Sequence, residues 1–219
     1  MERTILLPIA ALIVQAVAQA SPSPQLAQAD AASASLITTV TKPGSNDRRI
    51  GPGGFEENKG QVKQSDGQAA PYVKFRLTDG STNIFLLESG IAYQFNRMHD
   101  PEGYAELAHR SHLSSEDEAR LDDLRKQRRL ETCRMDMILE GADPHAPITT
   151  EVRSTDFTNY YLSGVEALDV HSFSKVIYHG IYPGIDWEVS TTDRGFEQDF
   201  IVHPGGDPSS IRMRFKGHE

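Results

Sequence analysis

Four carboxylates in the last third of the chain are spaced so that they could act together. Asp186 and Glu188 lie two positions apart in one predicted strand, and Glu197 and Asp199 lie two positions apart in the next. Side chains two positions apart on a strand share a face, so the four carboxylates would meet if the two faces coincide. Such a cluster could bind Ca²⁺, which takes several oxygen ligands, or could supply the two carboxyl groups of a glycoside hydrolase.

A solvated acidic face explains the same spacing without any ligand. Trp187 and Phe200 alternate with the carboxylates, so they would pack beneath that face. We favour this interpretation, because catalysis requires a pocket and an acid with a perturbed pKa, and the sequence indicates neither. A Ca²⁺ site at the four carboxylates is the alternative, and no catalytic or cofactor-binding residue is assigned.

The histidines and the single cysteine give weaker indications of chemistry. His109 and His112 lie three apart in a polar segment, and the remaining candidates, His171, His179 and His203, fall on predicted strand edges, where surface histidines are usual. Cys133 has no second cysteine with which to form a disulfide or a thiolate zinc site. We expect it to be a small buried residue at the start of a strand.

Five aromatic residues could form a platform that stacks against sugars, or could pack in the core: Tyr160, Tyr161, Tyr178, Tyr182 and Trp187. In a strand-rich domain such residues more often pack in the core or across strands, and we favour that interpretation.

The elements that would position these residues are mostly strands. Alternation of apolar and polar residues predicts three meandering strands at 72–77, 84–87 and 91–95, joined by turns at Asp79-Gly80 and Ser89-Gly90. Further strand patterns follow at 135–139, 160–162, 176–178, 185–189, 196–202 and 211–215.

One helix interrupts the strands. Ser115 precedes Glu118 by three positions, which is the pattern of a capping box, and a charged segment free of Gly and Pro runs to about residue 130. The fold predicted from these patterns is mostly β: an antiparallel β-sandwich-like domain with one inserted surface helix at about 114–130.

The first twenty residues predict export. An apolar stretch at 5–17 is followed by the small residues of Ala18-Gln19-Ala20, which is the layout of a secretory signal peptide. The stretch is shorter than the roughly 20 residues that span a bilayer, so no membrane span is expected after cleavage. Residues 21–54 have the low-complexity composition of a disordered leader, and residues 55–219 form the predicted β-rich domain. We therefore expect a secreted or cell-surface protein.

The charge of the chain argues against a nucleic-acid partner. The formal net charge is −9, and acidic residues surround the basic run at 125–129 at helical spacings. This run therefore predicts a solvated helix face.

Four segments, in order, carry a resemblance to a known family: Phe55-Glu56-Glu57-Asn58-Lys59-Gly60-Gln61-Val62, Asn159-Tyr160-Tyr161-Leu162-Ser163-Gly164, Val176-Ile177-Tyr178 with Ile181-Tyr182-Pro183-Gly184-Ile185-Asp186, and Asp199-Phe200-Ile201-Val202-His203-Pro204-Gly205-Gly206-Asp207-Pro208. Over about residues 55–217 the chain resembles the N-terminal β-domain of bacterial proteins that carry seven-bladed β-propeller (SBBP) repeats. In that family the domain follows a signal peptide and precedes propeller repeats or other β-domains in surface or gliding-associated proteins. The resemblance implies no reaction.

The chain departs from that family in two ways. The inserted helix is additional, and the family's domain continues beyond the last predicted strand. The resemblance therefore implies an incomplete module in which Met213 and Phe215, with either Trp187 or Phe200, would be left uncovered.

Two functions follow. The first is a non-catalytic β-rich module of an exported protein, which acts as a scaffold or in adhesion or ligand binding, with a glycan or other surface ligand and downstream β-domains as partners. The alternative is a secreted polysaccharide hydrolase that uses the acidic hairpin. We favour the first, because no pocket is indicated around the carboxylates.

The predicted signal peptide sets the first residue of the exported protein. Cleavage after Ala20 would leave Ser21 at the N-terminus, because small residues at Ala18 and Ala20 suit signal peptidase. Mass spectrometry of protein recovered outside the cytoplasm checks this. Exported protein that still carries residues 1–20 would contradict it.

Overall fold

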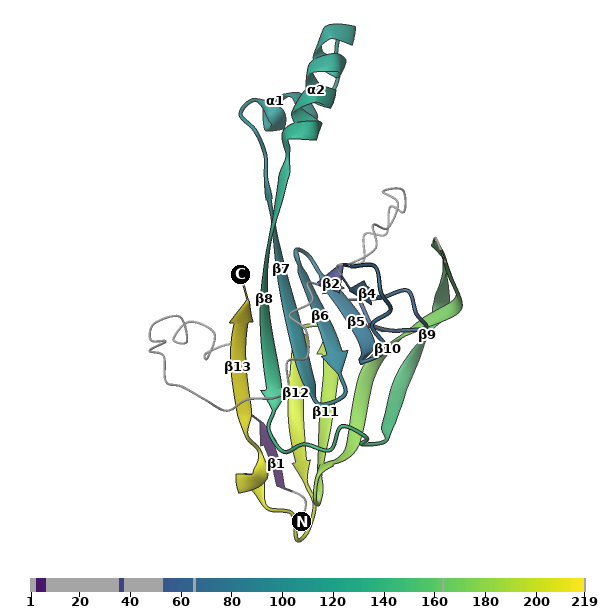
Figure 1. Ribbon diagram of the computed structural model, residues 1–219, viewed down its shortest axis with the longest axis vertical. Helices are drawn as coiled ribbons and strands as arrows, with labels where there is room; N and C mark the ends of the chain where they lie inside the picture. Colours follow the sequence, from purple (N-terminus) through teal and green to yellow (C-terminus); the bar gives the residue numbers. More distant parts are fainter. Residues whose placement is uncertain (1–2, 7–35, 38–52, 65, 163, 219) are drawn as a thin grey trace.

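The structure is mostly β, as the alternating pattern predicts (Figure 1). It is a computed structural model, and it describes residues 3–6, 36–37, 53–64, 66–162 and 164–218. Within these residues eleven strands form one curled antiparallel sheet, in the order β1-β12-β11-β10-β3-β5-β6-β7-β8-β13, with β9 paired to β10. The strands are β1 (Arg3–Leu6), β3 (Phe55–Glu57), β5 (Val73–Asp79), β6 (Thr82–Leu87), β7 (Gly90–His99), β8 (Arg129–Leu139), β9 (Ile148–Leu162), β10 (Val165–Tyr182), β11 (Ile185–Thr192), β12 (Gly195–Val202) and β13 (Met213–His218).

The predicted meander is confirmed in β5, β6 and β7. Asp79 pairs with Thr82 across the first turn, and Leu87 pairs with Gly90 across the second. Gly80 adopts a φ of 56°, a conformation that glycine reaches at little cost. The predicted hairpin near the C-terminal end is confirmed as β11 and β12, joined by Asp193 and Arg194.

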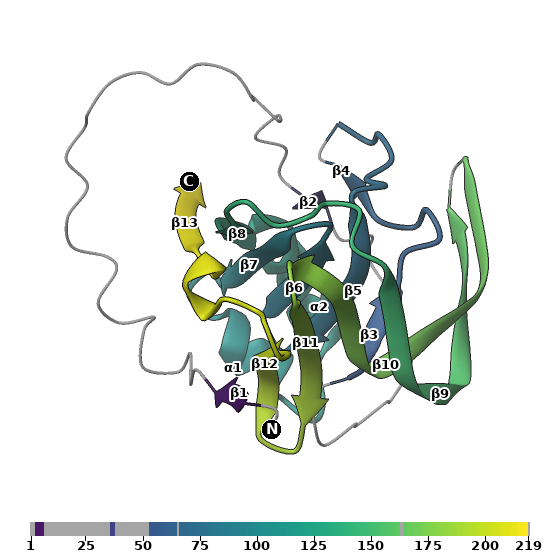
Figure 2. The same cartoon turned by 90° about the horizontal axis from the view of Figure 1, so that it is seen from below.

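β10 connects the two halves of the sheet. Its edge opposite β9 pairs with β11 from Lys175 to Tyr182 and with β3 at Ser172 and Phe173. The sheet therefore curls at β10, so that the strands surround a common core (Figure 2). This arrangement resembles a sandwich made from a single sheet.

The core lies between the two halves of the curled sheet. β5–β8 contribute one side and β10–β12 the other, including Phe75, Leu77, Leu86, Ile91, Met137, Val176, Tyr178, Trp187, Val189 and Phe200. The Trp187 ring lies 4.8 Å from that of Tyr178, and its Nε1 donates to Gln198 Oε1 at 3.2 Å. The largest core side chain is therefore also satisfied in its polar atom.

The apolar residues expected to be uncovered are mostly covered. Trp187 and Phe200 are both buried, which corrects that expectation, because the two halves of the sheet close over them. Met213 packs partly against the core, and Phe215 is 41 % exposed.

The inserted helix is present but shorter than predicted. α2 covers Ser115–Gln127, and its capping box pairs Ser114 with Asp117 where Ser115 and Glu118 were expected. A short helix that the sequence did not indicate, α1 (Tyr104–Ala108), packs beside it at the end of the ribbon formed by β7 and β8 (Figure 1).

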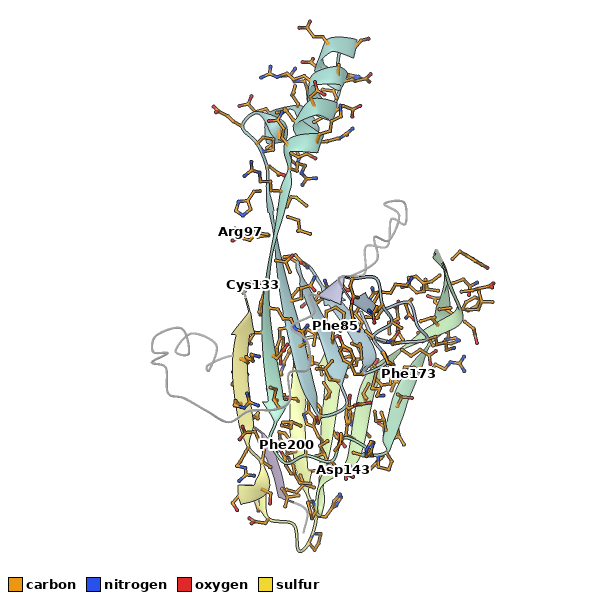
Figure 3. All side chains as sticks on the ribbon, viewed as in Figure 1. Phe85, Arg97, Cys133, Asp143, Phe173 and Phe200 are labelled. Atoms are coloured by element: carbon orange, nitrogen blue, oxygen red, sulfur yellow. The ribbon has the colours of Figure 1, made fainter. Side chains whose placement is uncertain are left out.

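Cys133 is exposed, and not buried as predicted. It lies on β8 opposite Phe95, where β7 and β8 leave the body of the sheet and continue as a two-stranded ribbon (Figure 3). The core no longer covers the strands at this level, which is the physical reason for the error.

Parts of the predicted signal peptide and leader are strands. Residues 3–6 form β1 against β12, and β2 (Leu36–Ile37) pairs with β4 (Lys63–Gln64). Leu36 and Ile37 of the predicted leader thus lie in a short strand, and the prediction of a disordered leader stays a prediction. The other residues of 1–52 lie outside the described part of the chain, and nothing described tests cleavage after Ala20.

β9 and β10 continue beyond β3 as a two-stranded hairpin of residues 153–171, the β9–β10 arm (Figure 1). An isolated two-stranded hairpin is only marginally stable in water, so the arm requires support from the body. Tyr160, Ala167 and Val170 form a small buried cluster within it.

A buried ion pair ties the arm to the sheet. Arg76 of β5 lies 2.8 Å from the Glu56 carboxylate of β3, and Tyr160 Oη donates to the same carboxylate at 2.7 Å. Arg76 also donates to Tyr160 Oη, at 3.1 Å. Burial, with the nearby charge of Glu56, raises the pKa of Tyr160 to about 12, so its hydroxyl remains a donor.

A second set of bonds holds the base of the arm. Lys59 Nζ donates to the carbonyl of Asp169 at 2.7 Å, and the His171 N–H donates to the Glu57 carboxylate at 3.0 Å. The segment that begins at Phe55 therefore fixes the arm through three of its side chains, those of Glu56, Glu57 and Lys59.

We expect Glu56→Ala to lower the free energy of unfolding by about 3 kcal/mol, because it leaves the buried Arg76 guanidinium without its counter-charge. Tyr160→Phe should cost about 1 kcal/mol, the usual value of one hydrogen bond. Urea unfolding followed by tryptophan fluorescence measures both changes.

The matched control is Glu88→Ala. Glu88 pairs with Lys74 at a similar distance, 2.9 Å, but both side chains are partly exposed, so we expect a loss of about 1 kcal/mol or less. Equal losses in Glu56→Ala and Glu88→Ala would show that the buried pair does not support the arm.

Candidate functional site

The four predicted carboxylates share the outer face of β11 and β12. Glu188 pairs directly with Asp199, and the neighbouring positions Ser190 and Glu197 also pair. Directly opposed residues on antiparallel strands point to the same side, so the two acidic pairs do lie on one face. Trp187 and Phe200 alternate with them and are buried beneath.

Three of the carboxylates are engaged with separate partners on that face. Lys175 Nζ lies 3.0 Å from Glu188 Oε2, and Thr192 Oγ1 donates to Glu197 Oε1 at 3.1 Å. Asp186 turns toward histidines, as described below. Among the described residues no three His, Cys, Asp or Glu side chains are grouped to hold a metal ion. The Ca²⁺ site stays a prediction, because the four carboxylates are not grouped around one point in the described structure.

Asp199 is the carboxyl group with the most unfavourable surroundings on this face. Burial raises its pKa, and the negative charges of Glu188 and Glu197 raise it further, while Lys175 opposes them in part. Asp199 is half-buried and lies opposite Glu188, whose carboxylate is paired with Lys175. A carboxyl group with a raised pKa beside an ionised carboxylate is an arrangement that can supply a general acid.

Asp186 forms the centre of a hydrogen-bonded cluster at the end of the sheet. His179 Nδ1 and His203 Nε2 lie 3.2 Å and 3.1 Å from Asp186 Oδ2, and the Gly180 N–H donates to Oδ1 at 2.7 Å. Thr149 Oγ1 lies 2.7 Å from the other ring nitrogen of His179.

The pKa of Asp186 reflects this cluster. Burial alone would raise its pKa, but the hydrogen bonds from Gly180, His203 and His179 outweigh burial and lower it. The carboxylate is therefore held ionised, and it links β9, β10, β11 and the segment after β12.

The two histidines are residues that sequence reasoning treated as scattered. The sequence feature that could have predicted their proximity is the Pro-Gly turn that follows each histidine, at Pro183-Gly184 and Pro204-Gly205. Gly184 has a φ of 71°, and the His203 N–H donates to its carbonyl at 2.9 Å. A Cβ on Gly206 would lie 2.5 Å from the same carbonyl oxygen, so the two turns touch only because both carry glycine.

The aromatic residues divide between core and surface. Tyr160, Tyr178, Tyr182 and Trp187 are buried, as favoured above, whereas Tyr161 is 74 % exposed. Phe157, which the sequence reasoning did not single out, is also exposed. Both exposed rings lie on the β9–β10 arm.

An open groove of about 440 Å³ lies beside the start of β5, lined by Glu57, Asn58, Gly60, Ala69, Ala70, Pro71, Val73, Lys74, Phe75, Ile148 and Thr150. The side chains of Glu57, Asn58 and Lys74 among these have other partners. Asn58 alone donates to the carbonyls of Ala70 and Val73 and accepts from the N–H groups of Gly60 and Val62. These four hydrogen bonds fix the turn at Asn58–Val62 against the segment Ala70–Val73, and the two segments form one side of the groove.

Comparison with known proteins adds one match. A family model described as a domain of unknown function (DUF7948) matches residues 55–219. No curated protein matches, and neither does a solved structure. No helix in the described residues is both long and apolar enough to cross a membrane.

The acidic face generates a prediction about pH. The folded pKa of Asp199 is raised, so its ionised form is less favourable in the folded state than in the unfolded state. This penalty is absent below the unfolded pKa of about 3.9 and grows as pH rises toward the folded pKa. Asp199→Asn should therefore raise the melting temperature at pH 7 and have little effect at pH 3.

Asp186→Asn is the matched control with the opposite sign. The folded pKa of Asp186 is lowered, so its contribution is present above the unfolded pKa and is lost as pH falls through the folded one. The variant should melt below wild type at pH 7, and the difference should shrink in acid. Shifts of the same sign in both variants at pH 7 would refute this account.

Proposed function

We propose that the chain, which belongs to the DUF7948 family of domains of unknown function, is a non-catalytic β-rich module of an exported protein. In this role it is secreted or displayed at the cell surface after its signal peptide is removed. It acts as a scaffold or in adhesion and ligand binding, next to further β-domains of a longer protein such as the propeller repeats that the sequence resemblance implies.

The observation that carries the proposal is the construction of the β9–β10 arm. Its inner side is held by the buried Glu56–Arg76 pair, and its outer side exposes Phe157 and Tyr161. Exposed aromatic residues on a segment that a rigid body holds in place are typical of binding surfaces.

The polar motif residues support the non-catalytic part of the proposal. The Asn58 side chain hydrogen-bonds to four backbone groups. The Asp186 carboxylate hydrogen-bonds to the Gly180 N–H and to the rings of His179 and His203. Side chains in these positions hold turns and strand ends together. Their spacing in the sequence is thereby explained by structure.

One observation favours the alternative, a secreted polysaccharide hydrolase. Asp199 combines a raised pKa with a carboxylate, Glu188, directly opposite. An acid and a carboxylate that flank a glycosidic bond are the minimum requirement for hydrolysis. If the chain is a hydrolase, substitutions among the four carboxylates of the β11–β12 hairpin should therefore abolish its activity.

A hydrolysis assay separates the two functions. We expect the mature protein to release no more reducing ends than buffer from cellulose, xylan, chitin and β-1,3-glucan between pH 4 and pH 8. Glu188→Gln, Glu197→Gln and Asp199→Asn would then show no difference from wild type. Hydrolysis by the wild-type protein that Glu188→Gln or Asp199→Asn abolishes would establish the alternative and overturn the proposal.

A further inference from the structure

We propose that copies of the mature chain assemble head to tail, with the β12 edge of one copy paired to the β13 edge of the next. The inference rests on the proposed removal of the signal peptide. It adds a partner, a second copy of this chain, and the two surfaces that meet.

The curled sheet ends in two different strands. Among the described residues β1 and β13 stand at the two ends of the strand order, and each is paired on one side only. β1 lies within the predicted signal peptide, so its removal leaves β12 as the end strand. An end strand presents backbone N–H and C=O groups that can pair with another strand.

The edge of β12 already carries a strand in the structure. Residues 3–6 pair with it antiparallel, from Arg3 opposite Val202 to Leu6 opposite Asp199 (Figure 2). The edge is therefore accessible to an added strand and has the geometry to pair with one. In the precursor residues 3–6 occupy the surface that a second copy would need, so assembly begins only after cleavage.

The outer faces of the two edges carry opposite charges at matching spacing. Glu197 and Asp199 lie two positions apart on the outer face of β12. Met213 of β13 packs against the core, so the alternate residues Arg214 and Lys216 lie on the outer face. In the antiparallel register that sets Asp199 opposite Arg214, Glu197 lies opposite Lys216. Opposite charges directly across two strands stabilise the pair.

The same register also matches the inner faces. It sets Phe200 opposite Met213, and Gln198 opposite Phe215. Phe200 and Gln198 are buried, and Phe215 is 41 % exposed. Pairing would thus continue the inner face of one copy into that of the next and cover Phe215. A shift by one position would instead set apolar residues opposite charged ones.

At the β12 edge the carboxylates are in excess. Lys175 pairs with Glu188, so one lysine stands against three carboxylates when Glu197 and Asp199 are included. The turn between β11 and β12 adds one charge of each sign, Asp193 and Arg194. Burial and the two acidic neighbours raise the pKa of Asp199, and Lys175 offsets this only in part. A guanidinium from a second copy would stabilise the ionised carboxylate and so favour pairing.

At the β13 edge the cations are in excess. Arg214 Nε lies 2.7 Å from Glu140 Oε1. Asp136 of β8 lies opposite Lys216 and is paired with Arg134. Three cations here stand against two carboxylates. The two edges therefore differ in the sign of their charge and attract each other.

The charges also exclude pairing between two identical edges. Antiparallel pairing of β12 with its own copy would bring Glu197 and Asp199 near the same carboxylates of that copy. Two β13 edges would likewise bring Arg214 and Lys216 near cations. β12 therefore binds β13, and each copy can hold one neighbour at each end of its sheet. Such a contact between different surfaces extends beyond a dimer.

The mass of the protein in solution tests the inference. The full chain of 219 residues and the chain that begins at Ser21 are compared by sedimentation velocity over a concentration series. We expect the chain from Ser21 to grow past the mass of a dimer as concentration rises, and the full chain to stay monomeric at the same concentrations. A synthetic peptide of residues 1–10 should inhibit association of the chain from Ser21, because it covers the β12 edge.

An exchange of charges between the edges tests the register. In the chain from Ser21, Asp199→Arg or Arg214→Asp alone should weaken association about tenfold, because like charges then face each other across the strands. The two substitutions in one chain restore opposite charges and should return association to near the wild-type level. Recovery in the double variant shows that the single losses do not come from misfolding. Glu166→Arg is the matched control, because this exposed acid lies on the β9–β10 arm, and it should associate like wild type.

A chain from Ser21 that stays monomeric at every concentration would overturn the inference. A mass that stops at a dimer would do so too, as would association that both single charge reversals leave unchanged. Association of the full chain at the same concentrations would overturn the role given to residues 3–6.

Failure of the inference is distinct from failure of the proposed function, because the chain from Ser21 can be produced directly. An exported chain that lacks hydrolase activity but stays monomeric loses only the assembly inferred here. A chain that keeps residues 1–20 outside the cytoplasm, or that hydrolyses polysaccharide, loses the proposed function itself.

Discussion

The buried contact between Arg76 and Glu56 is the interaction on which the arrangement of the arm depends. A guanidinium removed from water is costly unless a carboxylate and further hydrogen bonds compensate it. Glu56 provides the charge, and Tyr160 bridges the two groups. Because these residues come from β5, β3 and β9, the cost of burying the charge is recovered only when all three strands are in place. The contact therefore selects one position of the arm.

The same constraint shapes the sheet around β10. This strand pairs with β11 along one part of its edge and with β3 along the next, so β3 must begin where β11 ends. Phe55, which is fully buried, fills the core at this junction, and Glu56 beside it points to the other face of β3. One short strand thus closes the core with one residue and anchors the arm with the next.

Prediction from sequence succeeded where the determining interactions are local. The β5–β6–β7 meander and the β11–β12 hairpin follow from alternation and from turn residues such as Gly80. It failed where burial depends on distant strands. Cys133 continues an apolar pattern, but the core ends below it. β9 was seen only near Tyr160, because most of its residues are polar and exposed and so show no period of two.

The candidate sites divide in the same way. The shared face of Asp186, Glu188, Glu197 and Asp199 follows from spacing alone. The ionisation of these groups does not, because it depends on partners that the fold supplies. His203 lies on a segment beyond the hairpin and lowers the pKa of Asp186, whereas burial and neighbouring carboxylates raise that of Asp199. Two aspartates on one face thus acquire opposite shifts.

The two projecting hairpins show how support determines what a segment can do. The β7–β8 ribbon is stabilised at its far end by its own helices, where Leu107 and Leu121 are buried and the Arg128 guanidinium lies 4.5 Å from the centre of the Tyr104 ring. The β9–β10 arm is instead stabilised at its base and along its inner side by Lys59, Glu57 and the Arg76–Glu56 pair. The ribbon is therefore stabilised from its tip by contacts within itself. The arm is stabilised by contacts with the body at Asp169, His171 and Tyr160, so its packing depends on β3, β5 and the segment after β3.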